Sequence, residues 1–253
     1  MAASIATYLV LSSGCKVRGV PRKTSRDGRV PLTRLRIAKA ALRVIDSEGL
    51  DALTMKRLGS ELGVAAMSLY SHFSNKDELL DEVVDLLFRE LELPDGEGRE
   101  WTDVALGLFS SLRRHLLGHL DSVSLVASRR VWSVDALAPT EMSLQNLREA
   151  GFDEWEAIDG HRLLLSFTLG YVLSEASARR VPAIHPEDWG IASYAVHAVS
   201  ADQAPTLAAL APIALAGHSD EQFDRCLRDI LTALWCRREA RLAADEPAPA
   251  RQP

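Results

Sequence analysis

The side chains with the strongest potential for chemistry are few and scattered in this sequence. His115 and His119 stand four positions apart, so on a helix they share one face and could hold a metal ion. No carboxylate or third ligand follows at a convincing spacing, so we predict no metal site and favour a His115 that faces a ligand. Cys15, Cys226 and Cys236 form no CxxC pair, which argues against a zinc site and a disulfide framework.

Sequence motifs of known catalytic sites are also missing. There is no Gly-x-Ser-x-Gly, HExxH, Walker A or complete GxGxxG pattern, and no pair of carboxylates stands out. We predict that the chain is not an enzyme and needs no cofactor.

Charge is divided unevenly along the chain. Of the 253 residues, 47% are apolar and 25% charged, as in ordinary soluble proteins, and the net charge is -6. Residues 1–76 carry 13 Lys and Arg against 5 Asp and Glu, whereas residues 77–253 carry 16 against 30. A basic first part on an acidic remainder predicts that only the first part meets a polyanion such as nucleic acid. The alternative is two solvated faces whose charges differ by chance.

Residues 1–31 are interpreted as a flexible basic arm, because they combine Gly, Ser, Pro and basic side chains without apolar periodicity. The segment from Ile5 to Cys15 faintly resembles a lipoprotein cleavage site. No positive charge precedes its apolar part, as a secretory signal requires, so a disordered extension or a start codon placed too early is favoured. No run approaches about 18 apolar residues, so we predict no membrane span and a cytoplasmic protein.

Signals for three short helices follow the arm. Thr33 and Thr54 are good N-caps, and each is flanked by two apolar residues at the spacing of a hydrophobic staple. Gly49 ends the first predicted helix and Gly63 the second. A third short helix is predicted from Ala65 to Ser71. Three helices within about 40 residues, with a Gly turn between the second and third, indicate a helix-turn-helix unit.

A fourth helix is predicted to begin near Asn75. Glu78 stands three positions later, at the spacing of a capping box, and apolar residues recur at helical intervals as far as Leu91. Pro94–Gly98 then breaks the chain with a hinge or long turn. Beyond this turn the sequence predicts only helices, because no segment of useful length shows the two-residue period of a β-strand.

The residues of the helix-turn-helix unit carry a more specific signal than the helix pattern alone. The runs Leu53-Thr-Met-Lys-Arg-Leu58, Leu62-Gly-Val64 and Leu69-Tyr-Ser-His-Phe-Ser-Asn-Lys76 closely resemble the TetR family of ligand-responsive transcriptional regulators. Apolar, Gly and polar positions all agree, and the match extends from Thr33 to Leu87. The remainder resembles the family only in helix order and rough helix length.

This resemblance implies an all-α protein. A three-helix helix-turn-helix DNA-binding domain is expected at residues 32–78 and a helical ligand-binding and dimerisation domain at 79–243, followed by a disordered tail at 244–253. The implied partners are double-stranded operator DNA, a small-molecule effector and a second copy of the chain, with no membrane involved. The residues expected to fix the crossing of the second and third helices, here called the small core, are Leu58, Leu62, Val64 and Leu69.

The family places its DNA contacts in and around the second and third helices. The resemblance implies that Tyr70, His72 and Lys76 donate to phosphates, while Thr54 would cap its helix and touch a phosphate. The full predicted DNA-binding set is Thr54, Lys56, Arg57, Ala65, Ala66, Met67, Ser68, Tyr70, His72 and Lys76. Alternatives stay open: Tyr70 could close the small core, and His72 could only pack beside Phe73. Lys76 could be a solvated lysine at a helix start.

The expected base-reading face is poor in polar side chains. Ala65, Ala66 and Met67 offer contacts to thymine methyl groups and few hydrogen bonds. Lys56 could reach a guanine edge, so we expect specificity to depend on Lys56, Ser68 and DNA shape.

Two long helices dominate the expected second domain. Asp153 and Glu156, at capping-box spacing, open one that runs to about Ala178. Its centre, Leu163–Leu173, is apolar on nearly every side and must be buried on nearly every side. The last helix, Ser219–Arg241, carries a heptad-like stripe of Phe223, Cys226, Leu227, Ile230, Leu231, Leu234 and Trp235. In the family these helices form a four-helix bundle with their two-fold mates, so a homodimer is expected; a monomeric core is the alternative.

The ligand pocket is expected between the helices that begin near Trp101, Thr140 and Asp153. Its predicted lining is Phe109, Leu112, His115, Trp132, Met142, Leu164, Phe167 and Tyr171. For each of these residues, a place in the plain core is an equally weighted alternative. Shorter helices are expected from about Val104 to His119, Asp121 to Arg130, Pro139 to Gly151 and Glu187 to Ala198.

The sequence thus predicts a sequence-specific DNA-binding regulator, expected to be a repressor that a small-molecule ligand releases from a palindromic operator. One alternative is an architectural DNA-binding protein that needs no ligand. A helical enzyme with a DNA-binding head is the other.

Overall fold

The computed structural model describes residues 31–129, 131, 133–180, 202, 204–214 and 218–245. The arm predicted before residue 31, Trp132, the helix predicted at 187–198 and most of the predicted tail lie outside these residues. The chain divides into a short unit, Met1–Leu32, and a second unit, Thr33–Pro253, which is the one described below.

All regular structure in the described residues is helical, which confirms the all-α class. The helices are α2 (Arg34–Glu48), α3 (Met55–Leu62), α4 (Ala66–Leu69), α5 (Lys76–Arg89), α6 (Trp101–Leu117), α7 (Val123–Ser128), α8 (Ala138–Glu149), α9 (Glu154–Arg180), α11 (Pro205–Ala214) and α12 (Asp220–Asp245). Short 3-10 helices are η1 (Leu50–Ala52), η2 (Leu120–Ser122) and η3 (Asp135–Leu137). None of the described helices has the length and apolar character that a membrane span needs.

The starts of the first helices follow from capping side chains. The hydroxyls of Thr33 and Thr54 each accept a hydrogen bond from the backbone N–H three positions on, at 3.2 and 3.0 Å. Asn75 Oδ1 accepts one from the N–H of Glu78 at 2.8 Å. Each bond satisfies a backbone donor that has no partner inside its helix. The predicted starts of α2, α3 and α5 are therefore confirmed.

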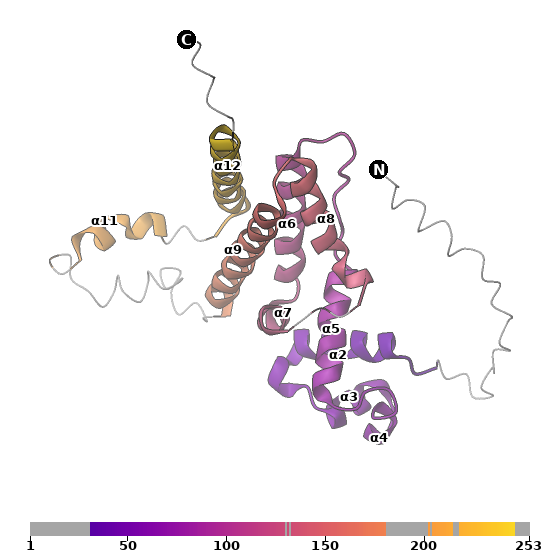
Figure 1. Ribbon diagram of the computed structural model, residues 1–253. Helices are drawn as coiled ribbons and strands as arrows, with labels where there is room; N and C mark the ends of the chain where they lie inside the picture. Colours follow the sequence, from indigo (N-terminus) through magenta and orange to yellow (C-terminus); the bar gives the residue numbers. More distant parts are fainter. Residues whose placement is uncertain are drawn as a thin grey trace, which may run out of the picture. The chain divides into compact units, whose positions relative to one another are not determined.

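Helices α2 and α5 supply the core beneath the helix-turn-helix unit. Ile37, Ala41 and Ile45 of α2 form the predicted apolar stripe and are fully buried, as are Leu79 and Val83 of α5. Helix α5 packs on α2 and also contacts α7, α8 and η3, so it belongs both to the helix-turn-helix unit and to the helices that follow (Figure 1).

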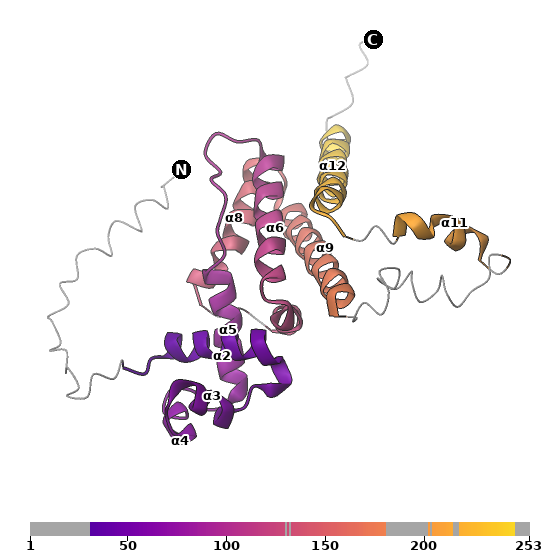
Figure 2. The ribbon, with the colours of Figure 1, turned by 180° about the vertical axis from the view of Figure 1, so that it is seen from behind.

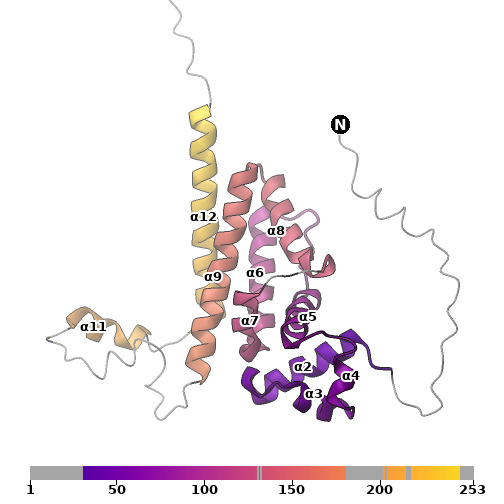
Figure 3. The ribbon, with the colours of Figure 1, turned by 60° about the horizontal axis from the view of Figure 1, so that its bottom comes forward.

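Among the remaining helices, α6, α8 and α9 pack against one another and α12 lies along α6 and α9 (Figures 2 and 3). Helices α9 and α12 are antiparallel. Arg241 Nε lies 2.9 Å from Glu156 Oε1 near one end of the pair, and Tyr171 OH lies 3.3 Å from Gln222 Oε1 near the other. Asp153 and Glu156 cap α9 reciprocally, as predicted, through bonds of 2.9 and 3.0 Å.

Burial along α9 differs from the prediction. Leu164, Thr168 and Val172 are fully buried, but Leu163 is 46% exposed and Leu173 37% exposed. The expectation that the centre is buried on nearly every side is wrong for the single chain, because its neighbouring helices cover only part of the circumference. An apolar face that stays uncovered in a single chain is typical of a surface that meets a partner.

The apolar stripe of α12 also needs a correction. Leu227, Leu231 and Leu234 are at most 3% exposed, because they pack within the same chain. Leu231 in particular is 1% exposed, whereas Trp235 at the edge of the stripe is 36% exposed. Most of the stripe therefore joins α12 to α6 and α9 and is not free to meet a second copy.

Candidate DNA-binding and ligand-binding sites

Two glycines set the geometry of the turn between α3 and α4. Gly63 ends α3 with a φ of 67°, in the left-handed region that glycine adopts without steric cost. Gly59 lies inside α3, and a Cβ there would stand 2.8 Å from Val64 O and 3.2 Å from Ala66 N. Only a residue without a Cβ lets the start of α4 approach α3 so closely. The sequence analysis identified Gly63 but missed Gly59, because a glycine inside a helix gives no local sign of the contact it permits.

Helix α4 presents its predicted base-reading residues to the outside. Leu69 turns inward and is fully buried together with Leu58, whereas Met67 is 77% exposed and Tyr70 46% exposed. The other residues of this face are Ala65 and Ser68, both exposed, and Ala66, which is half-buried. Tyr70 therefore does not close the small core, and its phenol ring remains accessible to a phosphate.

The connection from α4 to α5 is held by Arg34 of α2. Its guanidinium lies 4.1 Å from the centre of the Phe73 ring and donates to the carbonyl oxygen of His72 at 2.5 Å. It also donates to Glu78 at 2.6 Å. The Ser74 N–H, and then Arg34, lower the pKa of Glu78 below its usual value. The backbone from which α5 starts is thereby fixed relative to α2.

The basic side chains predicted to bind DNA differ in the ion pairs that they form within the described part of the chain. Lys56 is exposed and Lys76 half-buried, and neither forms an ion pair with the described residues. Arg57 instead donates to Glu48 Oε1 at 2.5 Å, to Glu48 Oε2 at 3.1 Å and to Glu61 Oε2 at 2.9 Å. These bonds tie α3 to the end of α2, so we revise the place of Arg57 from a DNA contact to a support of the DNA-binding surface.

A cavity of about 130 Å³ lies among α5, α6, α7, α8 and α9. Its lining consists of Phe88, Leu91, Leu108, Phe109, Leu112, Val126, Arg129, Val131, Pro139, Thr140, His161, Leu165 and Leu169. An apolar cavity with a few polar groups is typical of a small-molecule site, although such sites usually measure roughly 300–1,000 Å³. This cavity must widen before it can admit a ligand of that size.

Only part of the predicted pocket lining reaches the cavity. Phe109 and Leu112 do so. Residues that lie elsewhere are His115, Met142, Leu164, Phe167 and Tyr171, while Trp132 is outside the described residues. Phe167 and Tyr171 pack against Phe223 of α12, with ring centres 5.3 and 5.1 Å away. The apolar pattern could not distinguish the side of α9 that faces the cavity from the side that faces α12.

The described lining of the cavity contains three polar residues that the sequence pattern did not indicate, Arg129, Thr140 and His161. Arg129 Nη1 donates to Asp77 O at 3.0 Å and to Asp81 Oδ1 at 2.7 Å, and its Nη2 donates to Asp77 Oδ1 at 2.6 Å. His161 Nδ1 lies 3.0 Å from Ser143 Oγ, and burial lowers the pKa of His161. One arginine therefore borders the cavity and binds the first turns of α5, the helix that starts at the DNA-binding surface.

The histidine pair identified from the sequence lies beside this cavity, not in it. The rings of His115 and His119 are in contact, with centres 5.2 Å apart. Burial, and then the neighbouring His119, lower the pKa of His115. His119 Nδ1 lies 2.9 Å from Asp46 Oδ2, which connects the end of α6 to α2. Among the described residues, no three His, Cys, Asp or Glu side chains gather in a way that could hold a metal ion.

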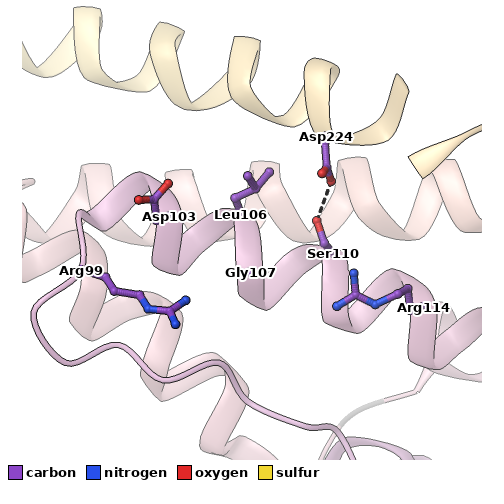
Figure 4. A pocket seen from close by; sticks show the side chains of 7 residues that line it. All are labelled: Arg99, Asp103, Leu106, Gly107, Ser110, Arg114 and Asp224. Atoms are coloured by element: carbon purple, nitrogen blue, oxygen red, sulfur yellow. Dashed lines mark hydrogen bonds between the residues drawn. The ribbon is translucent and has the colours of Figure 1, made fainter. Parts of the chain in front are cut away.

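A second hollow of about 420 Å³ runs along the outer face of α6 beside α12 (Figure 4). It is lined by Arg99, Asp103, Leu106, Gly107, Ser110, Arg114 and Asp224. Ser110 Oγ donates to Asp224 Oδ1 at 2.8 Å across the two helices. This hollow is open and mostly polar, so a small ligand would bury little surface there. The smaller, apolar cavity is the better ligand site despite its volume.

The chain matches two protein-family models. The first, "Bacterial regulatory proteins, tetR family", matches residues 37–83, and the second, "Tetracyclin repressor-like, C-terminal domain", matches residues 93–235. An HTH-type transcriptional regulator of Saccharopolyspora erythraea is 32% identical over 207 residues, which cover 81% of this chain and 85% of that protein. The class A tetracycline repressor protein from transposon 1721 of Escherichia coli is 31% identical over 142 residues, covering 55% and 65%.

A solved structure extends this similarity to the fold. Apo ActR from Streptomyces coelicolor superposes with a TM-score of 0.71 at 32% identity, and the match covers 83% of this chain and 98% of ActR. ActR in complex with actinorhodin also gives a TM-score of 0.71. The chain belongs to the TetR family of bacterial regulatory proteins. It is a DNA-binding transcriptional regulator.

Proposed function

We propose that this regulator is a cytoplasmic repressor that binds a palindromic operator as a homodimer and leaves it when a small-molecule ligand enters the cavity. The names of its relatives support the proposal, since one is a tetracycline repressor and ActR has been solved with actinorhodin bound. We keep residues 32–78 as the DNA-binding domain and residues 79–243 as the ligand-binding and dimerisation domain, with α5 shared between them.

The DNA-binding surface consists of α4, the start of α3 and the start of α5. Tyr70, His72 and Lys76 would donate to phosphates, which position the protein without reading bases. Lys56 would reach a base edge, because its charge is not used in an ion pair with the described residues. Thr54 would add a phosphate contact, and the exposed side chain of Met67 would touch thymine methyl groups.

The position of Arg129 is the observation that supports a response to ligand. It lines the cavity and binds Asp77 and Asp81 in the first two turns of α5. The residue before Asp77 is Lys76, which we assign to a phosphate. A ligand that displaces Arg129 would therefore move the start of α5 and, with it, the helix-turn-helix unit packed on that helix.

The uncovered side of α9 is the proposed dimer interface. It carries the partly exposed Leu163 and Leu173, with the small, exposed Ser166 and Gly170 between them. Within the part of the chain that the structure describes, nothing comes within 4 Å of where a Cβ of Gly170 would lie. Small residues between two leucines let a second helix approach closely, and a two-fold dimer fixes the spacing of the two DNA half-sites.

The small size of the cavity supplies a reason for release. A ligand larger than the cavity binds better to a widened conformation and increases its population. If the widened conformation misplaces the two helix-turn-helix units, the dimer can no longer engage both half-sites. By linkage, operator DNA must then weaken ligand binding by the same factor, typically about five- to 150-fold.

The test uses the DNA that flanks the gene of this regulator as the operator fragment. A thermal-shift screen of small, mainly apolar compounds identifies a ligand, which is then titrated calorimetrically into the free protein and into the operator complex. We expect weaker ligand binding in the complex; a scrambled DNA fragment, as control, should not weaken it. Equal affinities in both titrations would contradict release by that ligand and would favour a regulator that binds DNA without regard to ligand.

A further inference from the structure

The cavity is lined by a histidine whose protonated ring nitrogen can be identified from its contacts. His161 of α9 borders the cavity, and its Nδ1 lies 3.0 Å from Ser143 Oγ of α8. Ser143 is 3% exposed, and its hydroxyl makes no other hydrogen bond to the described residues. A buried hydroxyl that does not donate its proton is costly. Ser143 must therefore be the donor, and His161 Nδ1 the acceptor.

The other ring nitrogen of His161 then carries the proton. Burial, and then the nearby Arg162, lower the pKa of His161, which favours the neutral imidazole that an accepting Nδ1 requires. A neutral imidazole has one donor nitrogen and one acceptor nitrogen. With Nδ1 as the acceptor, Nε2 is the donor, and it has no hydrogen-bond partner among the described residues.

The rest of the lining limits the charge that a ligand can bring. Arg129 is already bound by two carboxylates, those of Asp77 and Asp81, so its positive charge is compensated. Among the described residues of the lining, Arg129, His161 and Thr140 are the ones with polar side chains. Burying an unpaired charge in such a place is costly, so the lining favours an uncharged ligand.

We propose that His161 Nε2 donates a hydrogen bond to the effector, and that the effector is an uncharged, mainly apolar ring compound with a carbonyl oxygen as acceptor. This inference rests on the proposed role of the cavity as the ligand site. A ring is favoured because Phe88 and Phe109 line the cavity, the latter with its ring centre 6.5 Å from that of His161. The cavity of about 130 Å³ is slightly smaller than the ~150 Å³ in which an apolar site binds benzene, so a substituted ring fits only after the cavity widens.

Two probes of nearly equal shape test the hydrogen bond. Acetophenone carries a C=O group where α-methylstyrene carries C=CH₂, so they differ chiefly in the acceptor. Their dissociation constants are measured by calorimetry on the full chain without DNA, for the wild type and for His161→Phe. We expect His161→Phe to weaken the binding of acetophenone relative to that of α-methylstyrene by about three- to tenfold. This factor corresponds to the contribution of one hydrogen bond.

The matched control is His218→Phe, which removes a histidine that packs on Tyr171 outside the cavity. It should leave the ratio of the two constants unchanged. An unchanged ratio in a folded His161→Phe variant would overturn the inference, and so would a wild type that binds neither probe at millimolar concentration.

A measurement on the wild type keeps the inference testable even if His161→Phe does not fold. Long-range ¹H–¹⁵N spectra distinguish the protonated from the unprotonated ring nitrogen, and we expect the proton of His161 on Nε2. A proton on Nδ1 would overturn the inference. Ser143→Ala removes the group that fixes the tautomer, so acetophenone should bind more weakly while α-methylstyrene is little affected.

Failure of this inference can be separated from failure of the proposed function. Probe binding is measured without DNA, whereas release is measured as the change in operator affinity. Acetophenone that binds through His161 without affecting operator affinity would count against release and leave the hydrogen bond intact. A ligand found by screening that releases operator equally well from wild type and His161→Phe would support release and overturn the role of His161.

Discussion

Arg129 and Asp77 are joined twice: one guanidinium nitrogen lies 2.6 Å from the Asp77 carboxylate, and the other lies 3.0 Å from the Asp77 carbonyl oxygen. Both the side chain and the backbone of the first turn of α5 are thus held by a residue that borders the cavity. The Asp77 carboxylate is 78% exposed, and ion pairs so exposed contribute little to stability. These contacts, here called the clamp, therefore position the start of α5 more than they stabilise the fold.

The role of Arg129 in holding the start of α5 can be tested by replacing it with glutamine. Arg129→Gln frees the start of α5, so we expect operator affinity without ligand to fall about fivefold, corresponding to about 1 kcal/mol of coupling. The melting temperature should change little, and a bound ligand should alter operator affinity less than in wild type. Fluorescence anisotropy with labelled operator measures both. Arg148→Gln, which removes an arginine of the last turn of α8 that pairs with Glu154 in the first turn of α9, is the control. Wild-type DNA binding and ligand response in Arg129→Gln would exclude the clamp.

Gly59→Ala should damage DNA binding although alanine favours helices. Alanine gains about 1 kcal/mol of helix propensity over glycine. Its Cβ would stand 2.8 Å from Val64 O, a backbone atom at the turn that sets the start of α4. We expect operator affinity to fall by at least about tenfold, because α4 is displaced from the groove. Gly96→Ala is the control, since its nearest neighbour lies at 3.6 Å. An unaffected operator affinity would show that α4 tolerates the contact.

Lys76→Ala and Tyr70→Phe should weaken DNA binding by similar factors on all sequences, because phosphate contacts do not read bases. Lys76→Ala should also reduce the slope of log affinity against log salt by roughly one unit. Titrations of operator and scrambled DNA at several salt concentrations measure both effects. Lys39→Ala is a suitable control, because Lys39 is already paired with Glu90 at 2.7 Å. Full affinity at moderate salt would contradict the assignment of either residue to a phosphate.

The dimer interface is tested with exposed leucines of α9, because Leu231 of α12 is buried within its own chain. Leu163→Glu combined with Leu173→Glu should give a folded monomer, because charges would be buried without partners in the interface. Sedimentation and circular dichroism separate dissociation from unfolding. Leu137→Glu, at a residue 42% exposed in η3, should leave the dimer intact. A dimer of unchanged mass in the double variant would place the interface elsewhere.

The contact between the ends of α9 and α12 should make stability depend on pH. Hydrogen bonds from Arg241, and then from the Asp153 N–H, lower the pKa of Glu156 from its usual 4.5. A carboxylate whose pKa is lower in the folded protein than in the unfolded chain stabilises the fold at pH values above the unfolded pKa. This stabilisation is lost as the pH falls through the folded pKa. Glu156→Gln should therefore reduce the free energy of unfolding at pH 7 by about 1 kcal/mol, which lowers the melting temperature. This difference from the wild type should become smaller below about pH 4.

The control for this effect is Glu154→Gln, at an exposed position in the same first turn of α9. It should change the melting temperature little at any pH. A deficit of Glu156→Gln that is the same at pH 3 as at pH 7 would show that the carboxylate charge is not responsible.

Local signals in the sequence predicted the starts of α2, α3, α5 and α9 well. Thr33, Thr54 and Asn75 cap their helices because a short polar side chain can satisfy a free backbone N–H, and this depends only on nearby residues. Asp153 and Glu156 form their reciprocal cap for the same reason. The helix-turn-helix unit was predictable because its caps and its turn depend on residues that are close in the sequence.

Contacts between distant helices were not predictable from these patterns. Arg129 and Asp77 are 52 positions apart, and neither stands out from other charged residues in the sequence. Phe167 packs on α12 and Phe109 lines the cavity, although both are aromatic residues in apolar stretches. The stripe of α12 that contains Leu231 shows the same limit, because a periodic stripe identifies a buried face but not the helix that buries it.

The small volume of the cavity determines at what dose the regulator responds. Apparent ligand affinity equals the intrinsic affinity multiplied by the fraction of molecules already in the widened form. The cost of separating apolar walls such as Leu108, Leu165 and Leu169 keeps that fraction low. Under the proposed mechanism, traces of effector leave the gene silent, and only its accumulation relieves repression. Trimming one of these walls would sensitise the response without altering either the DNA-binding surface or the hydrogen bond to the effector.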